Sequence, residues 1–89
     1  MMRVKPGFIL RKVVGEYLLM PAGESAAGFG GYLLLNTVSA FLWEQMQTPK
    51  TRQDLLDAVL AKYAIDEATA SADLDAMLGQ FRQQGLLEE

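Results

Sequence analysis

The pattern of apolar and polar residues in the first third of the chain predicts a β-hairpin. The segment from Phe8 to Val14 is rich in β-branched and aromatic residues, which favour strands. Gly15 can take the positive φ that a tight reversal requires. Tyr17 to Met20 forms a second run, which Pro21 ends. We therefore expect two antiparallel strands joined at Gly15.

A third short strand is expected at residues 31–35, with the sequence GYLLL. This apolar run is too short to form a helix by itself. Residues 22–30, AGESAAGFG, are small and glycine-rich, as in a loop. The pattern thus places three antiparallel strands within residues 7–36.

Helical spacing begins after this third strand and predicts a first helix near 37–47. Asn36 or Thr37 can cap its N-terminus, and Thr48-Pro49-Lys50 breaks it. Its apolar positions are Val38, Phe41, Leu42 and Met46.

Two further helices are expected near 52–63 and 67–84. Thr51 and Asp54 form a variant of the capping box with a shorter acid, while Asp66 is a good N-cap for the last helix. Gly85 can end that helix in the left-handed conformation. The apolar stripe of the second helix consists of Leu55, Leu56, Val59, Leu60 and Tyr63, and that of the third of Leu74, Met77, Leu78 and Phe81.

The order of these elements indicates an α+β fold. A three-stranded antiparallel sheet is followed by a three-helix bundle, a winged-helix-like arrangement. With 89 residues, the chain is expected to form one domain over residues 1–89.

Composition excludes several kinds of chemistry. The chain has no cysteine and no histidine, so disulfides, Cys/His metal sites and thiolate or imidazole mechanisms are impossible. The N-terminus lacks the apolar segment of a signal peptide, and no run approaches the roughly 20 apolar residues of a membrane span. We expect a soluble cytoplasmic protein that uses no cofactor and contacts no membrane.

Charge is distributed unevenly along the chain. Residues 1–30 hold four basic and two acidic residues, a balance of +2, whereas residues 51–89 hold three basic and eight acidic residues, a balance of −5. Solvated helix faces explain most such patterns. An acidic helical surface would also disfavour nucleic acid and could suit a basic partner. A winged-helix DNA reader needs a basic third helix, and this one carries Asp66, Glu67, Asp73 and Asp75 against Arg82.

Candidate catalytic features are weak. Gly28, Gly30 and Gly31 resemble a phosphate loop, but a strand rather than a helix is expected to follow them. The carboxylate pairs Asp54/Asp57 and Asp73/Asp75 fall on solvated helix faces. Phe41 and Trp43 are interpreted as packing residues, one buried and the other partly so. We therefore expect no enzymatic activity.

The two edges of the expected sheet differ in their protection. Arg11, Lys12 and Pro6 blunt the first strand, whereas Tyr32 to Leu35 in the third carries neither charge nor proline. An unprotected edge can pair with a peptide that adds a strand. Alternatively, it is covered by the third helix, by the 22–30 loop or by a second copy of the chain.

Five stretches of the sequence together resemble the family of the pyrroloquinoline-quinone synthesis protein D. These PqqD-like domains are also called RiPP recognition elements, the peptide-recognition elements of ribosomal peptide modification. The stretches are Pro6-Gly7-Phe8 with Leu10-Arg11; Gly15-Glu16 with Pro21 and Gly23; Leu35-Asn36 with Ala40 and Leu42-Trp43-Glu44; Thr51 to Tyr63; and Asp73-Leu74 to Gly85-Leu86-Leu87.

This resemblance implies that the leader segment of a precursor peptide docks as a fourth strand on the third strand, against the third helix. On that basis, the peptide-binding residues would be Tyr32, Leu33, Leu34 and Leu35 on the strand, with Ala70, Asp73, Met77 and Gln80 on the helix. The resemblance also implies a partner enzyme that modifies the peptide, commonly a radical S-adenosylmethionine (radical SAM) enzyme. The sequence looks like the generic PqqD-like group rather than the quinone-pathway protein.

Two function classes follow. One is a leader-peptide binding module, and the other is an interaction protein that self-associates through the third strand, including a strand-swapped homodimer.

Overall fold

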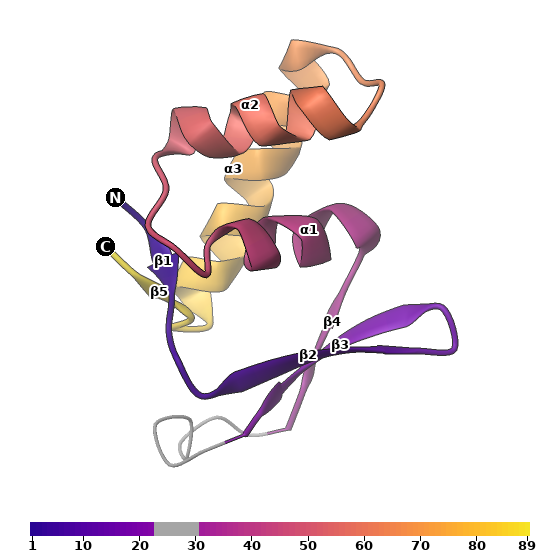
Figure 1. Cartoon of the computed structure of the whole chain (residues 1–89), viewed down its shortest axis with the longest axis vertical. Helices are drawn as coiled ribbons and strands as arrows, with labels where there is room; N and C mark the ends of the chain where they lie inside the picture. Colours follow the sequence, from indigo (N-terminus) through magenta and orange to yellow (C-terminus); the bar gives the residue numbers. More distant parts are fainter. Residues whose placement is uncertain (23–30) are drawn as a thin grey trace.

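The computed structural model describes residues 1–22 and 31–89, so the loop expected at 22–30, with Gly28 and Gly30, lies outside the described residues apart from Ala22. The described residues form a sheet and three helices, with α1 nearest to the sheet (Figure 1). The elements are β1 (Arg3–Val4), β2 (Phe8–Val13), β3 (Glu16–Pro21), β4 (Leu33–Leu35), α1 (Thr37–Gln45), α2 (Arg52–Lys62), α3 (Glu67–Gln83) and β5 (Leu87–Glu88). The α+β class and the order of strands and helices are confirmed.

The main sheet is an antiparallel meander in the order β2-β3-β4. Both outer strands are therefore edge strands, as the pattern predicted. β4 is shorter than the expected 31–35 run, because Gly31 and Tyr32 precede it, and Val14 lies in the turn rather than in β2. These are shifts of one or two residues at strand ends.

The turn between β2 and β3 places a valine in an unfavourable conformation. Val14 and Gly15 form a two-residue turn between the paired residues Val13 and Glu16, and their φ angles are 48° and 81°. Positive φ at both positions is the type I′ geometry that matches strand twist. Gly15 adopts it freely, but a β-branched residue does so only under strain. Val14 is 98% exposed, so no packing compensates for that strain.

The three helices begin at the expected caps. Asn36 Oδ1 accepts a hydrogen bond from Ser39 N at 2.8 Å, and Thr51 and Asp54 form a complete capping box. The Asp66 carboxylate accepts from Thr69 N and Oγ1 at 3.4 and 2.6 Å. Gly85, with φ 73°, follows the end of α3. These local side-chain bonds satisfy free N–H groups at helix starts, which fixes where each helix begins.

A second, two-stranded sheet was absent from the sequence expectations. β1 pairs with β5, with Arg3 opposite Glu88 and Val4 opposite Leu87. This pairing brings the two termini side by side (Figure 1). Each strand has two residues, which is too short to produce a detectable alternation.

The core lies between the inner face of the sheet and the helices. Trp43 is 2% exposed and packs edge-on against Phe8 and Phe81, with ring centroids 6.0 and 5.5 Å apart. Phe41 is partly buried, which agrees with its interpretation as a packing residue. Edge-on aromatic pairs stabilise a fold beyond the area that they bury. Trp43 therefore helps to hold β2 and α3 against its own helix, α1.

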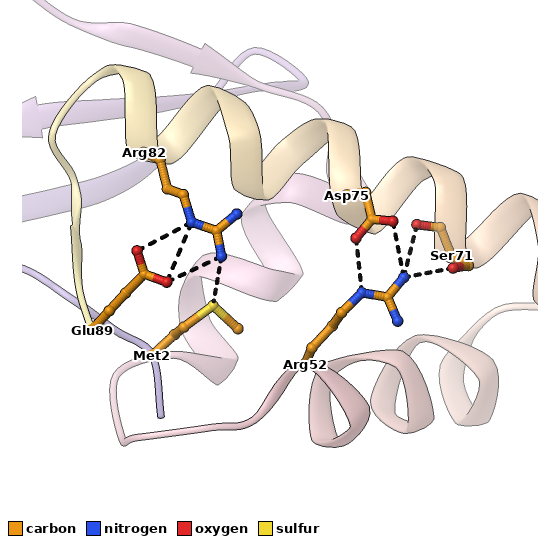
Figure 2. A network of polar contacts seen from close by, with 6 residues as sticks. All are labelled: Met2, Arg52, Ser71, Asp75, Arg82 and Glu89. Atoms are coloured by element: carbon orange, nitrogen blue, oxygen red, sulfur yellow. Dashed lines mark hydrogen bonds and ion pairs between the residues drawn. The ribbon is translucent and has the colours of Figure 1, made fainter.

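Ion pairs hold α3 against its neighbours. Arg52 of α2 reaches Asp75 with Nε–Oδ1 and Nη2–Oδ2 distances of 2.8 and 3.0 Å, and its Nη2 donates to Ser71 Oγ at 2.6 Å (Figure 2). Arg82 contacts Glu89 and the sulfur of Met2 at 3.1 and 3.5 Å (Figure 2). The two-point Arg52–Asp75 contact fixes the rotation of α3 better than a single bond would.

Replacing the strained turn residue should stabilise the fold. We expect Val14→Asn to raise the free energy of unfolding by about 1 kcal/mol, because Asn-Gly suits a type I′ turn and relieves the strain. Thermal melts followed by circular dichroism measure the change. Val13→Asn is the matched control, since it makes the same substitution in the extended strand and should not stabilise. A melting temperature for Val14→Asn at or below the original would contradict the strain argument.

Candidate functional site

The hydrogen-bonding direction along the sheet can be traced from one bond at its end. Ala22 N donates to Gly7 O at 2.7 Å, so Gly7 and Ala22 form a hydrogen-bonded pair. Pairs along an antiparallel ladder alternate between hydrogen-bonded and non-hydrogen-bonded. With the observed register, Leu18 therefore directs its backbone N–H and C=O towards β2. Its neighbours in β3, Tyr17 and Leu19, direct theirs towards β4.

This alternation divides the three residues of β4. Leu19 pairs with Leu33 and Tyr17 pairs with Leu35, so both leucines point their backbone groups towards β3. Leu34 points its N–H and C=O away from the sheet, towards the open edge. Within residues 1–22 and 31–89, β4 pairs with β3 alone. The described part of the chain thus leaves the Leu34 backbone groups available to another strand.

Side chains alternate in the same way. Leu35 is buried and Leu33 packs against the core, whereas Leu34 and Tyr32 are 54% and 63% exposed. Leu34 belongs to the outer face of the sheet, with Ile9 and Val13, which are also exposed. A strand added at Leu34 would therefore place successive side chains alternately on the outer face and on the helix side.

A groove of about 260 Å³ lies where β4 passes into α1. One wall is the junction between β4 and α1, and the other is the middle of α3. The lining residues are Asn36, Val38, Ser39, Asp73, Ala76, Met77 and Gln80. A second hollow, lined in part by Leu34, Leu35 and Tyr17, shares Asn36 with it. The end of β4 is therefore flanked by two hollows.

Three of the four expected helix residues meet in the groove. Asp73 and Gln80 are exposed on its wall, and Met77 is 5% exposed beneath them. Ala70 is 1% exposed in the core and is absent from the lining. Ala70 falls inside because the buried face of α3 is wider than its leucine and phenylalanine positions indicate.

Sequence reasoning missed the other lining residues, Asn36, Val38, Ser39 and Ala76. Helical periodicity offered a signal for Ala76, since it precedes Gln80 by one turn. Asn36 was identified as a helix cap, and that role is confirmed. Nothing in the local pattern showed that the start of α1 faces the middle of α3.

Hydrogen bonds favour the charged form of three carboxylates at helix starts or on α3. Hydrogen bonds from Arg52 lower the pKa of Asp75, the backbone N–H of Thr51 lowers that of Asp54, and Thr69 lowers that of Asp66. A general acid needs the opposite shift. Burial raises the pKa of Tyr63, whose hydroxyl has no hydrogen-bond partner in residues 1–22 or 31–89. Within the described residues, no group of three carboxylates gathers as a metal site would require.

Most of the chain matches a known protein family. Residues 16–87 match the family described as coenzyme PQQ synthesis protein D (PqqD). The chain belongs to this family. The match spans β3, β4 and all three helices, and so includes both walls of the groove.

Two solved structures share the PqqD fold of this chain. TbiB1 in complex with the TbiA(beta) leader peptide superposes with a TM-score of 0.73 at 23% identity, covering 97% of this chain and 94% of that one. Lasso peptide synthetase B1 complexed with the leader peptide gives a TM-score of 0.72 at 18% identity, covering 99% of this chain and 98% of that one. No curated protein sequence matches. None of the helices among the described residues is long and apolar enough to cross a bilayer.

Proline substitutions in β4 should separate folding from edge pairing. Leu33→Pro removes an N–H that faces β3, and we expect it to destabilise the domain by about 3 kcal/mol. Leu34→Pro removes an N–H that faces the open edge, so the fold should survive while strand addition is lost. Circular dichroism melts and peptide titration measure both effects.

Leu34→Ala is the control for side-chain loss, because it keeps the backbone donor. If folded Leu34→Pro bound a peptide as tightly as the original chain, pairing at this edge would be wrong.

Proposed function

We propose that this PqqD-family chain captures the leader segment of a ribosomally made precursor peptide by strand addition to β4. The observation that carries this proposal is the outward-facing backbone of Leu34 beside the groove of α1 and α3. Backbone hydrogen bonds to an added strand supply affinity, and pockets for alternate side chains supply selectivity. The two solved relatives, both described as leader-peptide complexes, support this choice of ligand.

In this proposal, residues Tyr32 to Leu35 form the receiving edge. The groove residues Asp73, Met77 and Gln80 contact side chains of the bound peptide, and Asn36, Val38 and Ser39 complete the groove. Ala70 contributes indirectly in this proposal, because it is buried in the core about two turns of α3 before Met77. This division assigns affinity to β4 and selection to α3.

The chain itself carries out no chemistry in this proposal. It presents the bound leader to a peptide-modifying enzyme in the cytoplasm, and the resemblance to PqqD-like domains favours a radical SAM enzyme. The outer face of the sheet leaves Ile9, Val13 and Leu34 exposed, which gives such an enzyme an apolar surface to contact. The carboxylates whose pKa values are lowered stay charged and are poor acids, which agrees with a binding role.

A second candidate is self-association through the same edge. Tyr32 and Leu34 expose large side chains beside backbone groups that no other described strand pairs, and such edges also pair with copies of themselves. Light scattering over a concentration series separates the two functions. Peptide capture gives a one-to-one complex of a monomer, whereas self-association gives a dimer that peptide does not dissociate.

Backbone methylation of the peptide tests strand addition directly. The probe is the leader segment of a precursor encoded beside this chain, with single backbone N–H groups methylated in turn. Because alternate residues of an added strand face β4, methylation should weaken binding at every second position and leave the positions between nearly unchanged. Isothermal titration measures each affinity. Uniform tolerance along the peptide would exclude strand addition.

A further inference from the structure

The side chains that line the groove beside β4 favour one kind of ligand side chain, unlike the backbone groups at the edge of the sheet. Its apolar lining residues are Val38, Ala76 and the buried Met77, and its polar lining residues are Asn36, Ser39, Asp73 and Gln80. Each of these four side chains carries an oxygen that can accept a hydrogen bond. None of the lining residues is cationic, and Asp73 is their one charged member.

Asp73 differs from Asp75 and Asp66, whose carboxylates have partners within the fold. Asp75 is held by Arg52, and Asp66 by its capping bonds to Thr69. The side chain of Asp73 makes no hydrogen bond or ion pair with any residue in 1–22 or 31–89, and it is exposed on the groove wall. Its charge is therefore available to a ligand rather than used in the fold.

The size of the groove fits one side chain. Pockets for small-molecule ligands usually enclose about 300 Å³ or more, and this groove encloses about 260 Å³. The start of α1 offers little to an anion, because Asn36 Oδ1 already accepts from Ser39 N and the carboxylate of Asp73 lines the same groove. A long side chain with an apolar stem and a cationic end matches the apolar and polar lining residues together.

The geometry of an added strand brings such a side chain to the groove. A peptide residue paired with Leu34 would place its side chain on the outer face, beside that of Leu34. The neighbouring peptide residue, next to Leu35, would turn its side chain to the helix side. Since Asn36 follows Leu35 directly and lines the groove, this side chain lies next to the opening.

Resting on the function proposed above, we propose that the groove selects peptides with a lysine or arginine at one fixed position, its stem lying over Met77 and its cation pairing with Asp73. The peptide residue concerned follows the one that pairs with Leu34 in the direction of Leu35. The selected peptide is thus basic at that position, in keeping with the net charge of −3 of the chain.

Selection from a library of displayed random linear peptides tests the inference, with the full chain as bait. We expect the enriched sequences to share a lysine or arginine at one aligned position. Asp73→Asn should bind these peptides about threefold to fivefold more weakly, the range for a partly exposed ion pair. Asp73→Lys should enrich aspartate or glutamate at the same position. Added salt should reduce the advantage of the original chain over Asp73→Asn.

Glu67→Gln is the matched control, because it removes one exposed carboxylate charge from the same helix at a position outside the groove lining. It should keep the basic preference, and melts of each variant should show that the fold is retained. Enriched peptides without a fixed basic residue, or equal binding by Asp73→Asn, would overturn the role of Asp73 and leave strand capture intact. Failure to enrich any peptide over bare resin would overturn the proposed function as well.

Discussion

The pairing of β4 with β3 is the constraint on which the candidate site depends. Leu33 and Leu35 bond to β3 through their backbones and pack inward through their side chains. Leu34 lies between them and is left with an exposed side chain and outward-facing backbone groups. The same alternation that fixes β4 in the sheet therefore creates the open edge.

The helices turn this open edge into a groove. α1 starts at Thr37, directly after its cap Asn36, so β4 ends where the groove begins. α3 forms the opposite wall, and its position is fixed by Trp43 packing against Phe81 and by the two-point contact of Arg52 with Asp75. Because the wall is held from the core side and from α2, its exposed residues are free for a ligand. Asp73 and Gln80 are two of these residues.

The sequence predicted the features that depend on neighbouring residues. The caps at Asn36, Thr51 and Asp66 and the stop at Gly85 are local hydrogen-bonding and φ effects, and all of them appear in the structure. β1 and β5 were not predicted, because strands of two residues show no periodic pattern. The open edge of β4 was expected. Which residue of β4 directs its backbone groups outward could not be predicted, because it depends on the register between neighbouring strands. The groove places Asn36, Val38 and Ser39 beside residues of α3 that lie more than thirty positions later, which no local pattern reveals.

Amide hydrogen exchange at Leu34 tests the central claim most directly. In the free chain, the Leu34 N–H should exchange fast, while those of Leu33 and Leu35 are protected by their bonds to β3. Saturation with a leader peptide should slow exchange at Leu34 strongly and change the other two little. If Leu34 were already protected in the free monomer, or remained fast in the saturated complex, capture by strand addition to β4 would be contradicted.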